Sequence, residues 1–388
     1  MRSVYLDHSA TTYVRPEVLE AMLPYFSEIF GNASSIHMTG QKARKALEES
    51  RAQVADLIHA DHKEVFFTSG GTESDNMAIK GVALANASKG KHIITSSIEH
   101  HAILNPCHVM EEQGFKITYL PVDKYGIVNP DDVKKALKSD TILVSIMLAN
   151  NEIGTIQPIA EIGKLLKGKG IIFHTDAVQA AGKIAIDVNQ LNVDLLTISA
   201  HKMYGPKGTG ALYIRQGTKI DPLLHGGHHE YTRRPGTENI AGIVGLAKAL
   251  TLACAEIPEF TSRMTKLRDK LEKGIKDKIS DVQLNGHPAK RLPNLLNMSF
   301  KYVEGESILL ALDLKGIAAS TGSACTSGSV EPSHVLLAMH VPPEIAQGSL
   351  RFSLGRVNTE EDIDYVIETL PPIIQKLREM SPLYKGKK

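Results

Sequence analysis

One lysine of the sequence, Lys202, stands between an apolar run and a Gly-Pro turn. The run Asp194 to Ile198 precedes it, and the break Gly205-Pro206-Lys207-Gly208 follows it. A lysine that is held at a strand end and partly desolvated can lose its proton and form a Schiff base with a carbonyl compound. Enzymes that use pyridoxal phosphate depend on this chemistry. An ordinary surface lysine is the alternative, and the neighbouring residues must decide between the two.

A carboxylate, Asp176, ends another apolar run, in the stretch Phe173-His174-Thr175-Asp176. Burying a carboxylate is costly unless a cationic partner lies beside it. A protonated pyridine nitrogen would be such a partner, and it would keep the ring ready to accept an electron pair from a substrate carbon. A helix N-cap is the other interpretation of this aspartate.

Three further strand ends carry polar groups. The turn Gly70-Gly71-Thr72 lies ahead of a helical pattern and offers backbone N–H groups and a hydroxyl to a phosphate. His100 follows the apolar run His92 to Ser96 and could lie on an aromatic ring, although a lone histidine is more often simply hydrogen-bonded. Asn151 follows another run, where a plain turn is the alternative. Because ligands of an open parallel sheet bind beyond the carboxyl ends of its strands, we predict a site there.

The three cysteines of the chain call for separate explanations. Cys107, Cys254 and Cys325 form no Cys-x-x-Cys pair, and their odd number argues against a disulfide framework or a structural zinc site. Cys325 lies among Gly, Ser and Thr residues, so we expect an exposed loop whose thiol can reach a substrate. Cys107 and Cys254 lie in apolar helical patterns and are predicted to belong to the core.

The elements that must position these residues alternate along the chain. We predict strands at 65–68, 92–96, 117–120, 142–148, 171–173, 195–198 and 211–214, and helices from Pro16, at 41–58 and at 102–113. Continuous apolar strands separated by helices indicate an α/β fold with a large, mainly parallel sheet that is covered on both faces.

A smaller α+β part is predicted after Pro258, which interrupts a helical pattern from Asn239 to about Lys278. Its predicted strands lie at 297–300, 317–320 and 350–353, and its predicted helices at 306–314, 333–339 and 360–380. We therefore predict a large domain over residues 13–257, and a small domain that combines residues 1–12 with residues 258–388 and carries the Cys325 loop.

The composition favours a small-molecule substrate. The 388 residues include 44 Lys and Arg against 43 Asp and Glu, so no global field favours nucleic acid or an anionic membrane. The acidic residue Asp7 comes too early for a signal peptide, and no run of apolar residues is long enough to span a bilayer. We expect a cytoplasmic location. The His-rich stretch 225–229 lacks the carboxylate or cysteine spacing of a metal site, and no metal is predicted.

Several motifs of the chain together resemble the NifS/IscS family of cysteine desulfurases. They are Asp176 to Gln179, Ser199 to Gly208, Arg233 to Asn239 and Ser320 to Ser327, and the resemblance extends from Tyr5 to Arg356 in the family's order. It implies a homodimeric pyridoxal phosphate enzyme of fold type I that turns L-cysteine into L-alanine and leaves the sulfur on Cys325 as a persulfide. The implied partners are an iron–sulfur scaffold or another sulfur-acceptor protein, and a persulfide could also ligate a cluster transiently.

The same resemblance implies a role for each matching position. Lys202 matches the Schiff-base lysine that removes the Cα proton, Asp176 the partner of the pyridine nitrogen, and Gln179 the donor to the ring hydroxyl. His100 matches the ring-stacking histidine and is a candidate for proton transfer at sulfur. Thr72, Ser199 and His201 match phosphate ligands, with Thr237 reaching the phosphate of the neighbouring subunit. Asn151 and Arg351 match groups that hold the substrate carboxylate, for which the Arg fork is suited.

Three alternatives differ in what they require of these residues. A selenocysteine lyase would use the same cofactor, as would an aminotransferase, but the cysteine in its Gly/Ser loop argues against an aminotransferase. The third alternative is a catalytically silent scaffold for sulfur-transfer partners, and the intact Lys202, Asp176 and Cys325 count against it.

Overall fold

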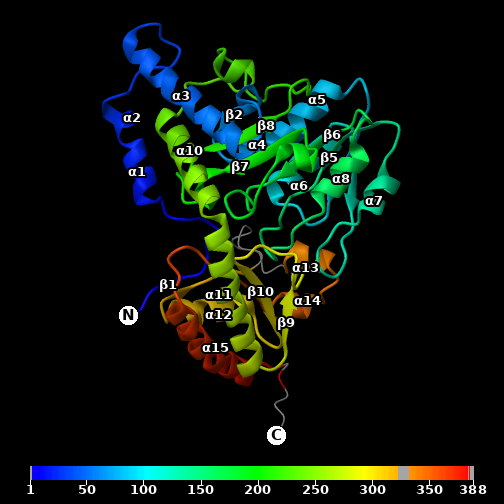
Figure 1. Cartoon of the computed structure of the whole chain (residues 1–388). Coiled ribbons are helices and arrows are strands. Elements are labelled where there is room, and N and C mark those ends of the chain that lie inside the picture. The colour runs from blue at the N-terminus through cyan, green and yellow to red at the C-terminus, as the bar shows by residue number, and fades with distance from the viewer. Residues whose placement is uncertain (1, 322–331, 383, 385–388) are drawn as a thin grey trace.

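The large part of the molecule is built on a seven-stranded sheet (Figure 1). The computed structural model describes residues 2–321, 332–382 and 384. The strands follow the order β2-β8-β7-β6-β5-β3-β4. Their bounds are β2 (Val65–Thr68), β3 (His92–Ser96), β4 (Lys116–Leu120), β5 (Thr141–Ser145), β6 (Ile172–Asp176), β7 (Leu195–Ser199) and β8 (Gly210–Ile214). β8 runs antiparallel to β2 and β7, whereas the other neighbours pair in parallel. The predicted mainly parallel sheet is confirmed.

Both faces of this sheet are covered, as predicted. Successive residues of a strand point to opposite faces, and on β7 Leu196 belongs to one hydrophobic cluster whereas Leu195 belongs to another. The first cluster includes α3 (Met38–Leu57), α7 (Pro130–Ala136), α8 (Ile159–Leu166) and α10 (Ile240–Ala255). The second includes the π-helical turn η2 (Met77–Gly81), α5 (Val82–Asn86) and α6 (His101–Glu112). Burial on both faces explains why the strands read as continuous apolar runs.

The remaining helices of the large part are short. They are α1 (Pro16–Met22), α2 (Pro24–Ser27), α4 (Gly71–Asn76) and α9 (Val188–Leu191), with 3-10 turns η1 (His62–Glu64), η3 (Ala200–Lys202) and η4 (His229–Thr232). α3 packs against α10, and α1 packs against the same helix. The predicted helices from Pro16, at 41–58 and at 102–113 are confirmed, with bounds that differ by a few residues.

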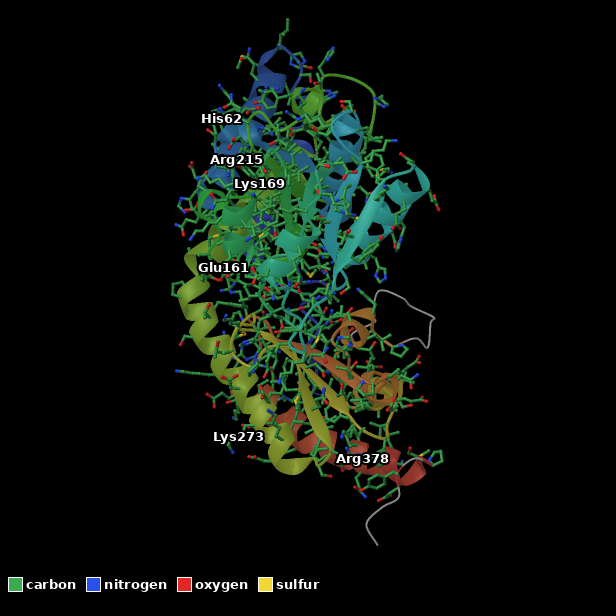
Figure 2. The ribbon with its side chains drawn as sticks, turned by 90° about the vertical axis from the view of Figure 1, so that its right-hand side faces the viewer. His62, Glu161, Lys169, Arg215, Lys273 and Arg378 are labelled. Carbon is green, nitrogen blue, oxygen red and sulfur yellow. The ribbon has the colours of Figure 1, made fainter. Side chains whose placement is uncertain are left out.

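A smaller α+β part lies below the large one in Figure 1. Its strands form the antiparallel sheet β12-β10-β9 and the parallel pair β1-β11. The strands are β1 (Val4–Tyr5), β9 (Val282–Asn285), β10 (Leu295–Phe300), β11 (Ile317–Ala318) and β12 (Ser349–Ser353). The helices are α11 (Ile257–Lys278), α12 (Gly305–Asp313), α13 (His334–Ala338), α14 (Pro343–Ala346) and α15 (Glu360–Met380). In the view of Figure 2, Lys273 marks α11 along one edge of this part and Arg378 marks α15.

The connection between the two parts is the junction of α10 and α11. The two helices meet at an angle of 70°, and Pro258 lies in the first turn of α11. A third hydrophobic cluster joins Val4 and Leu6 to α11, β10 and α15. This cluster supports a small domain that includes the N-terminal residues, and the boundaries at 12/13 and 257/258 stay a prediction. In the described part of the chain, no single helix is both long and apolar enough to cross a membrane.

Some short elements were not predicted. β9 pairs only four residues with β10, and three of the four are half buried, so their pattern gives no clear apolar run. β1 has two residues and depends on a partner more than three hundred residues away. Cys107 is buried in the second cluster, as predicted, whereas Cys254 is only half buried at the edge of the first.

Candidate active site

A cavity of about 290 Å³ lies at the carboxyl ends of the strands and collects most of the predicted site residues. Its lining includes Gly71, Thr72, His100, Asn151, Asp176, Gln179, Ser199, His201, Lys202 and Arg351. Arg351 comes from β12 of the small part, whereas Lys202 follows β7 of the large part. A larger groove, of about 640 Å³, surrounds Arg215 and Lys167 and contains none of these residues. We place the site in the smaller cavity because the chemically capable side chains converge there.

Lys202 is held by the N-terminal segment of the chain. β7 ends at Ser199, and the 3-10 turn η3 carries Lys202 into the cavity. Its Nζ donates to the backbone oxygens of Ser9 (2.6 Å) and Ala10 (2.7 Å). Both acceptors are neutral carbonyls, so they orient the amine without neutralising it. Lys202 is half-buried and lines the cavity, and its role as the Schiff-base lysine stays a prediction.

Asp176 ends β6 as a buried carboxylate. It accepts a hydrogen bond from the backbone N–H of Val178 at 2.8 Å, and burial raises the pKa of the carboxyl while Lys202 opposes that shift. Residues 178–183 form turns rather than a helix, so the N-cap alternative is wrong. A raised pKa at a buried carboxyl means that a cationic hydrogen-bond donor placed there would be strongly favoured.

Two further buried titratable groups, His174 and Asp75, lie close to Asp176. The ring of His174 contacts the hydroxyls of Ser145 (2.9 Å) and Thr197 (3.1 Å). Burial lowers the pKa of His174 to about 3, so this ring is neutral. Asp75, also buried, has a raised pKa because of burial and of the nearby Asp176. Asp75 lines the cavity, and the buried histidine beside it carries no permanent charge.

The predicted phosphate ligands surround the start of a helical run. α4 begins at Gly71, and a Cβ at this position would lie 2.9 Å from Cγ2 of Val178, so close packing favours glycine. Thr72, Ser199 and His201 line the same end of the cavity. Backbone N–H groups at a helix start and hydroxyls suit an anion. Burial, followed by Lys202, lowers the pKa of His201 to about 4, which leaves its ring neutral at neutral pH.

His100 caps helix α6 and lines the cavity. Its Nδ1 accepts from the backbone N–H of Ala102 at 3.1 Å, so the neutral ring carries its proton on Nε2. Burial and then Lys202 lower the pKa of His100 to about 4. The simple hydrogen-bonding alternative thus describes one ring nitrogen, and the ring-stacking role of His100 stays a prediction.

Arg351 is buried and oriented by two acceptors. Its Nη1 donates to the backbone oxygen of Asn151 at 3.1 Å, and its Nη2 donates to Asp7 at 2.9 Å. Its Nε has no hydrogen-bond partner among the described residues. The guanidinium is therefore held at the cavity with donor capacity left for a carboxylate.

Among the described residues, one predicted site residue stands apart from this cavity. Thr237 is exposed in the segment that follows η4 and does not line the cavity. Cys325 lies outside the described residues. Three residues without a predicted role in the site, Ser9, Asp7 and Lys183, contact the site residues directly. Lys183 follows Gln179 by four residues in the sequence. This short distance from a predicted site residue was the signal in the sequence that could have pointed to Lys183.

Comparisons with known proteins agree with this geometry. The family model for class-V aminotransferases matches residues 4–366. The chain is 62% identical to "Cysteine desulfurase IscS" of Methanosarcina thermophila over 98% of this chain and 94% of that protein. It is 60% identical to the protein of the same name from Dictyoglomus turgidum, over 98% and 97% of the two chains.

Solved structures give the same result. The structure named "NIFS-like protein" superimposes with a TM-score of 0.92 at 41% identity and covers 97% of this chain and 100% of its own. "SspA in complex with cysteine" superimposes with a TM-score of 0.81 at 37% identity, over 91% and 99% of the two chains. The resemblance and the fold type predicted from the motifs are confirmed. The chain belongs to the class-V aminotransferase family and, within it, to the cysteine desulfurases.

Proposed function

We propose that this protein converts L-cysteine into L-alanine and transfers the sulfur to Cys325 as a persulfide. The observation that carries the proposal is the convergence of Lys202, Asp176 and Arg351 on one cavity. An amino-acid reaction with pyridoxal phosphate requires three groups. They are an amine, an acceptor for the cationic ring nitrogen and a guanidinium that binds the substrate carboxylate.

The residues of the cavity fit pyridoxal phosphate, on which this family depends in general. Asp176 is buried with a raised pKa, as suits an acceptor for a protonated ring nitrogen. The hydroxyl of Ser9 is buried and without a hydrogen-bond partner among the described residues. Thr72, Ser199 and His201 would hold the phosphate, Gln179 the ring hydroxyl, and His100 one ring face. When bound, the cofactor supplies an electron sink for the pair released at the substrate Cα.

The chain's own groups then divide the work at the substrate. Arg351 and Asn151 would hold the substrate carboxylate, and Asp7 keeps Arg351 turned toward the cavity. The Nζ of Lys202, in its neutral form and oriented by the backbone oxygens of Ser9 and Ala10, would take the proton from Cα. His100 would carry a proton near the substrate sulfur through Nε2.

Sulfur transfer completes the reaction. As a thiolate, Cys325 attacks the substrate sulfur, an S–S bond forms, and the substrate C–S bond breaks. The carbon takes the electron pair and is protonated, so alanine is released while the enzyme thiol becomes a persulfide. The persulfide would then pass to an iron–sulfur scaffold or another acceptor protein. We also propose a homodimer, in which Thr237 reaches the phosphate of the neighbouring subunit.

The direct test compares the wild type with Cys325→Ser. We expect cysteine-dependent alanine release and a persulfide on Cys325 in the wild type, and a loss of alanine release of at least about a hundredfold in the variant, because the sulfur acceptor is missing. Alanine is measured by chromatography and the persulfide by mass spectrometry after alkylation. Cys254→Ser, which changes a half-buried cysteine that does not line the cavity, is the control and should keep full activity.

Two results would contradict the proposal in different ways. Undiminished turnover by Cys325→Ser would remove the persulfide role of Cys325. A wild type that binds the cofactor but releases no alanine from cysteine would remove the substrate assignment.

A further inference from the structure

Lys183 is a buried lysine for which the proposed reaction has no use. It is only 5% exposed and lies in the turns that follow β6. None of the ion pairs formed by the described residues includes it. Its Nζ instead donates to two oxygens of a single residue, the backbone oxygen of Gln179 at 3.0 Å and its side-chain Oε1 at 3.2 Å. A buried amine with two neutral acceptors needs an explanation, because burying lysine without a carboxylate is costly.

The hydrogen bonds of Lys183 suit its neutral form. Burial, followed by the nearby Lys202 and Arg351, lowers the pKa of Lys183 to about 7. A neutral amine has two N–H groups, which match the two oxygens of Gln179. Deprotonation therefore removes the buried charge and keeps both hydrogen bonds.

These bonds decide which end of the Gln179 amide faces the cavity. A side-chain amide has an accepting oxygen and a donating NH₂ group, and a half-turn exchanges them. The N–H donors of Lys183 fix the oxygen on its own side. Nε2 is thereby directed to the backbone oxygen of Ser9 at 3.0 Å. That same oxygen accepts from Lys202, so a continuous network joins Lys183 to the reactive amine.

We propose that Lys183 is a positioning residue of the active site, which holds the Gln179 amide with its N–H end toward the cofactor cavity. The inference rests on the proposed function, because there Gln179 donates to the ring hydroxyl of the cofactor. A donor at that oxygen stabilises its deprotonated form and so lowers the pKa of the cofactor–lysine linkage beside it. If the Gln179 amide were rotated by a half-turn, its oxygen would face the ring hydroxyl of the cofactor. The pKa of the cofactor–lysine linkage would then no longer be lowered.

The titratable and charged groups around Lys183 come from several elements. On the side of the site they are His8, His201, Lys202 and Arg351. Across a small enclosed space on the other side lie Arg15, Glu256 and Arg356, and Glu256 pairs with both of these arginines. Burial lowers the pKa of His8 to about 4. Cations thus predominate near Lys183, and the nearby carboxylate is already paired.

The test follows the absorbance band of the bound cofactor during a pH titration. Lys183→Met keeps the length of the side chain and removes its N–H donors, so the Gln179 amide can turn. We expect the pH midpoint of the band to rise by about one unit, the effect of losing one hydrogen bond to the charged form. Lys183→Arg keeps donors at this position and should shift the midpoint less. Lys164→Met, an exposed lysine on α8, is the control and should not change it.

A double-mutant cycle tests whether Lys183 acts through Gln179. Gln179→Leu removes the donor itself and should raise the midpoint as Lys183→Met does. In the Gln179→Leu background, Lys183→Met should add little further shift. An equal shift in both backgrounds, or no shift in Lys183→Met alone, overturns the proposal.

Folding is monitored by circular dichroism and thermal melting of each variant. If Lys183→Met does not fold, Lys183→Leu takes its place; it also has no N–H donor, so the same rise of the midpoint is expected, and no shift overturns the proposal. The outcome is separable from that of the proposed function. A wild type without a cofactor band or without cysteine turnover contradicts the function, whereas an active wild type with an unchanged Lys183→Met titration contradicts only the role of Lys183.

Discussion

At the scale of single residues, burial rather than ion pairing sets the protonation states around the cavity. It lowers the pKa of His100 to about 4 and raises that of Glu99 to about 8. Glu99 is fully buried, where the Ser96 hydroxyl and the backbone N–H of Met147 contact its carboxyl group. At neutral pH the residues next to the site therefore include a neutral histidine and a mostly protonated glutamic acid.

Glu99 predicts a pH dependence of stability. Its pKa is raised in the folded state, so its stabilising contribution is complete below the ordinary value of 4.5 and is lost as pH rises toward 8. Glu99→Gln keeps the hydrogen-bonding shape but does not ionise. We expect the free energy of unfolding of the wild type to fall between pH 5 and 8 by about 3–4 kcal/mol more than that of Glu99→Gln. Urea unfolding at each pH measures this difference. Glu112→Gln, at the exposed end of α6, is the control, and equal slopes in all three proteins would contradict the prediction.

At the scale of elements, one buried ion pair holds an irregular segment to the large sheet. Arg51 of α3 makes two hydrogen bonds of 2.7 Å to Glu230, and both side chains are buried. Glu230 also accepts from the backbone N–H of Phe67 in β2. Glu230 and the two residues after it have positive φ angles of 46°, 53° and 70°. Such a backbone is unfavourable for non-glycine residues, so the ion pair and its hydrogen bonds must hold it in place.

Removing one partner of this pair should be strongly destabilising. Arg51→Met leaves Glu230 buried without its cation, and we expect a loss of about 3–5 kcal/mol in the free energy of unfolding. Arg51→Met/Glu230→Gln should recover part of that loss because no unpaired charge remains. Arg44→Met, on the same helix, breaks only an exposed pair with Glu48 and should cost less than about 1 kcal/mol. Similar losses for Arg51→Met and Arg44→Met in denaturant unfolding would show that the buried pair is not an anchor.

At the scale of the whole molecule, the sheet and the strand-end residues of the site could be predicted from the sequence. The long-range contacts that hold those residues in place could not. Asp176 and Lys202 follow apolar runs, and such runs are readable because each strand is buried on both faces. The contact of Asp7 with Arg351 spans 344 positions, and the acceptors Ser9 and Ala10 come from a segment without regular structure. Long-range pairing of this kind leaves no periodic signal. The packing requirement for glycine at position 71 is likewise visible only from its contact with Val178.

The proposed homodimer predicts that an exposed apolar surface on the N-terminal helices is covered by a second copy of the chain. α1 and α2 lie along one side of the large part (Figure 1), where Phe26 is 63% exposed; Phe30 and Ile36, in the following loop, are 70% and 91% exposed. Large exposed apolar side chains are candidates for interaction sites, and the proposed second subunit is a partner that would cover them. Phe30→Asp/Ile36→Asp should shift the protein from dimer to monomer in sedimentation at micromolar concentration and weaken cofactor retention, since Thr237 is proposed to act across subunits. Leu314→Asp, an equally exposed change after α12, should leave the dimer intact. A double variant that stays dimeric would place the interface elsewhere.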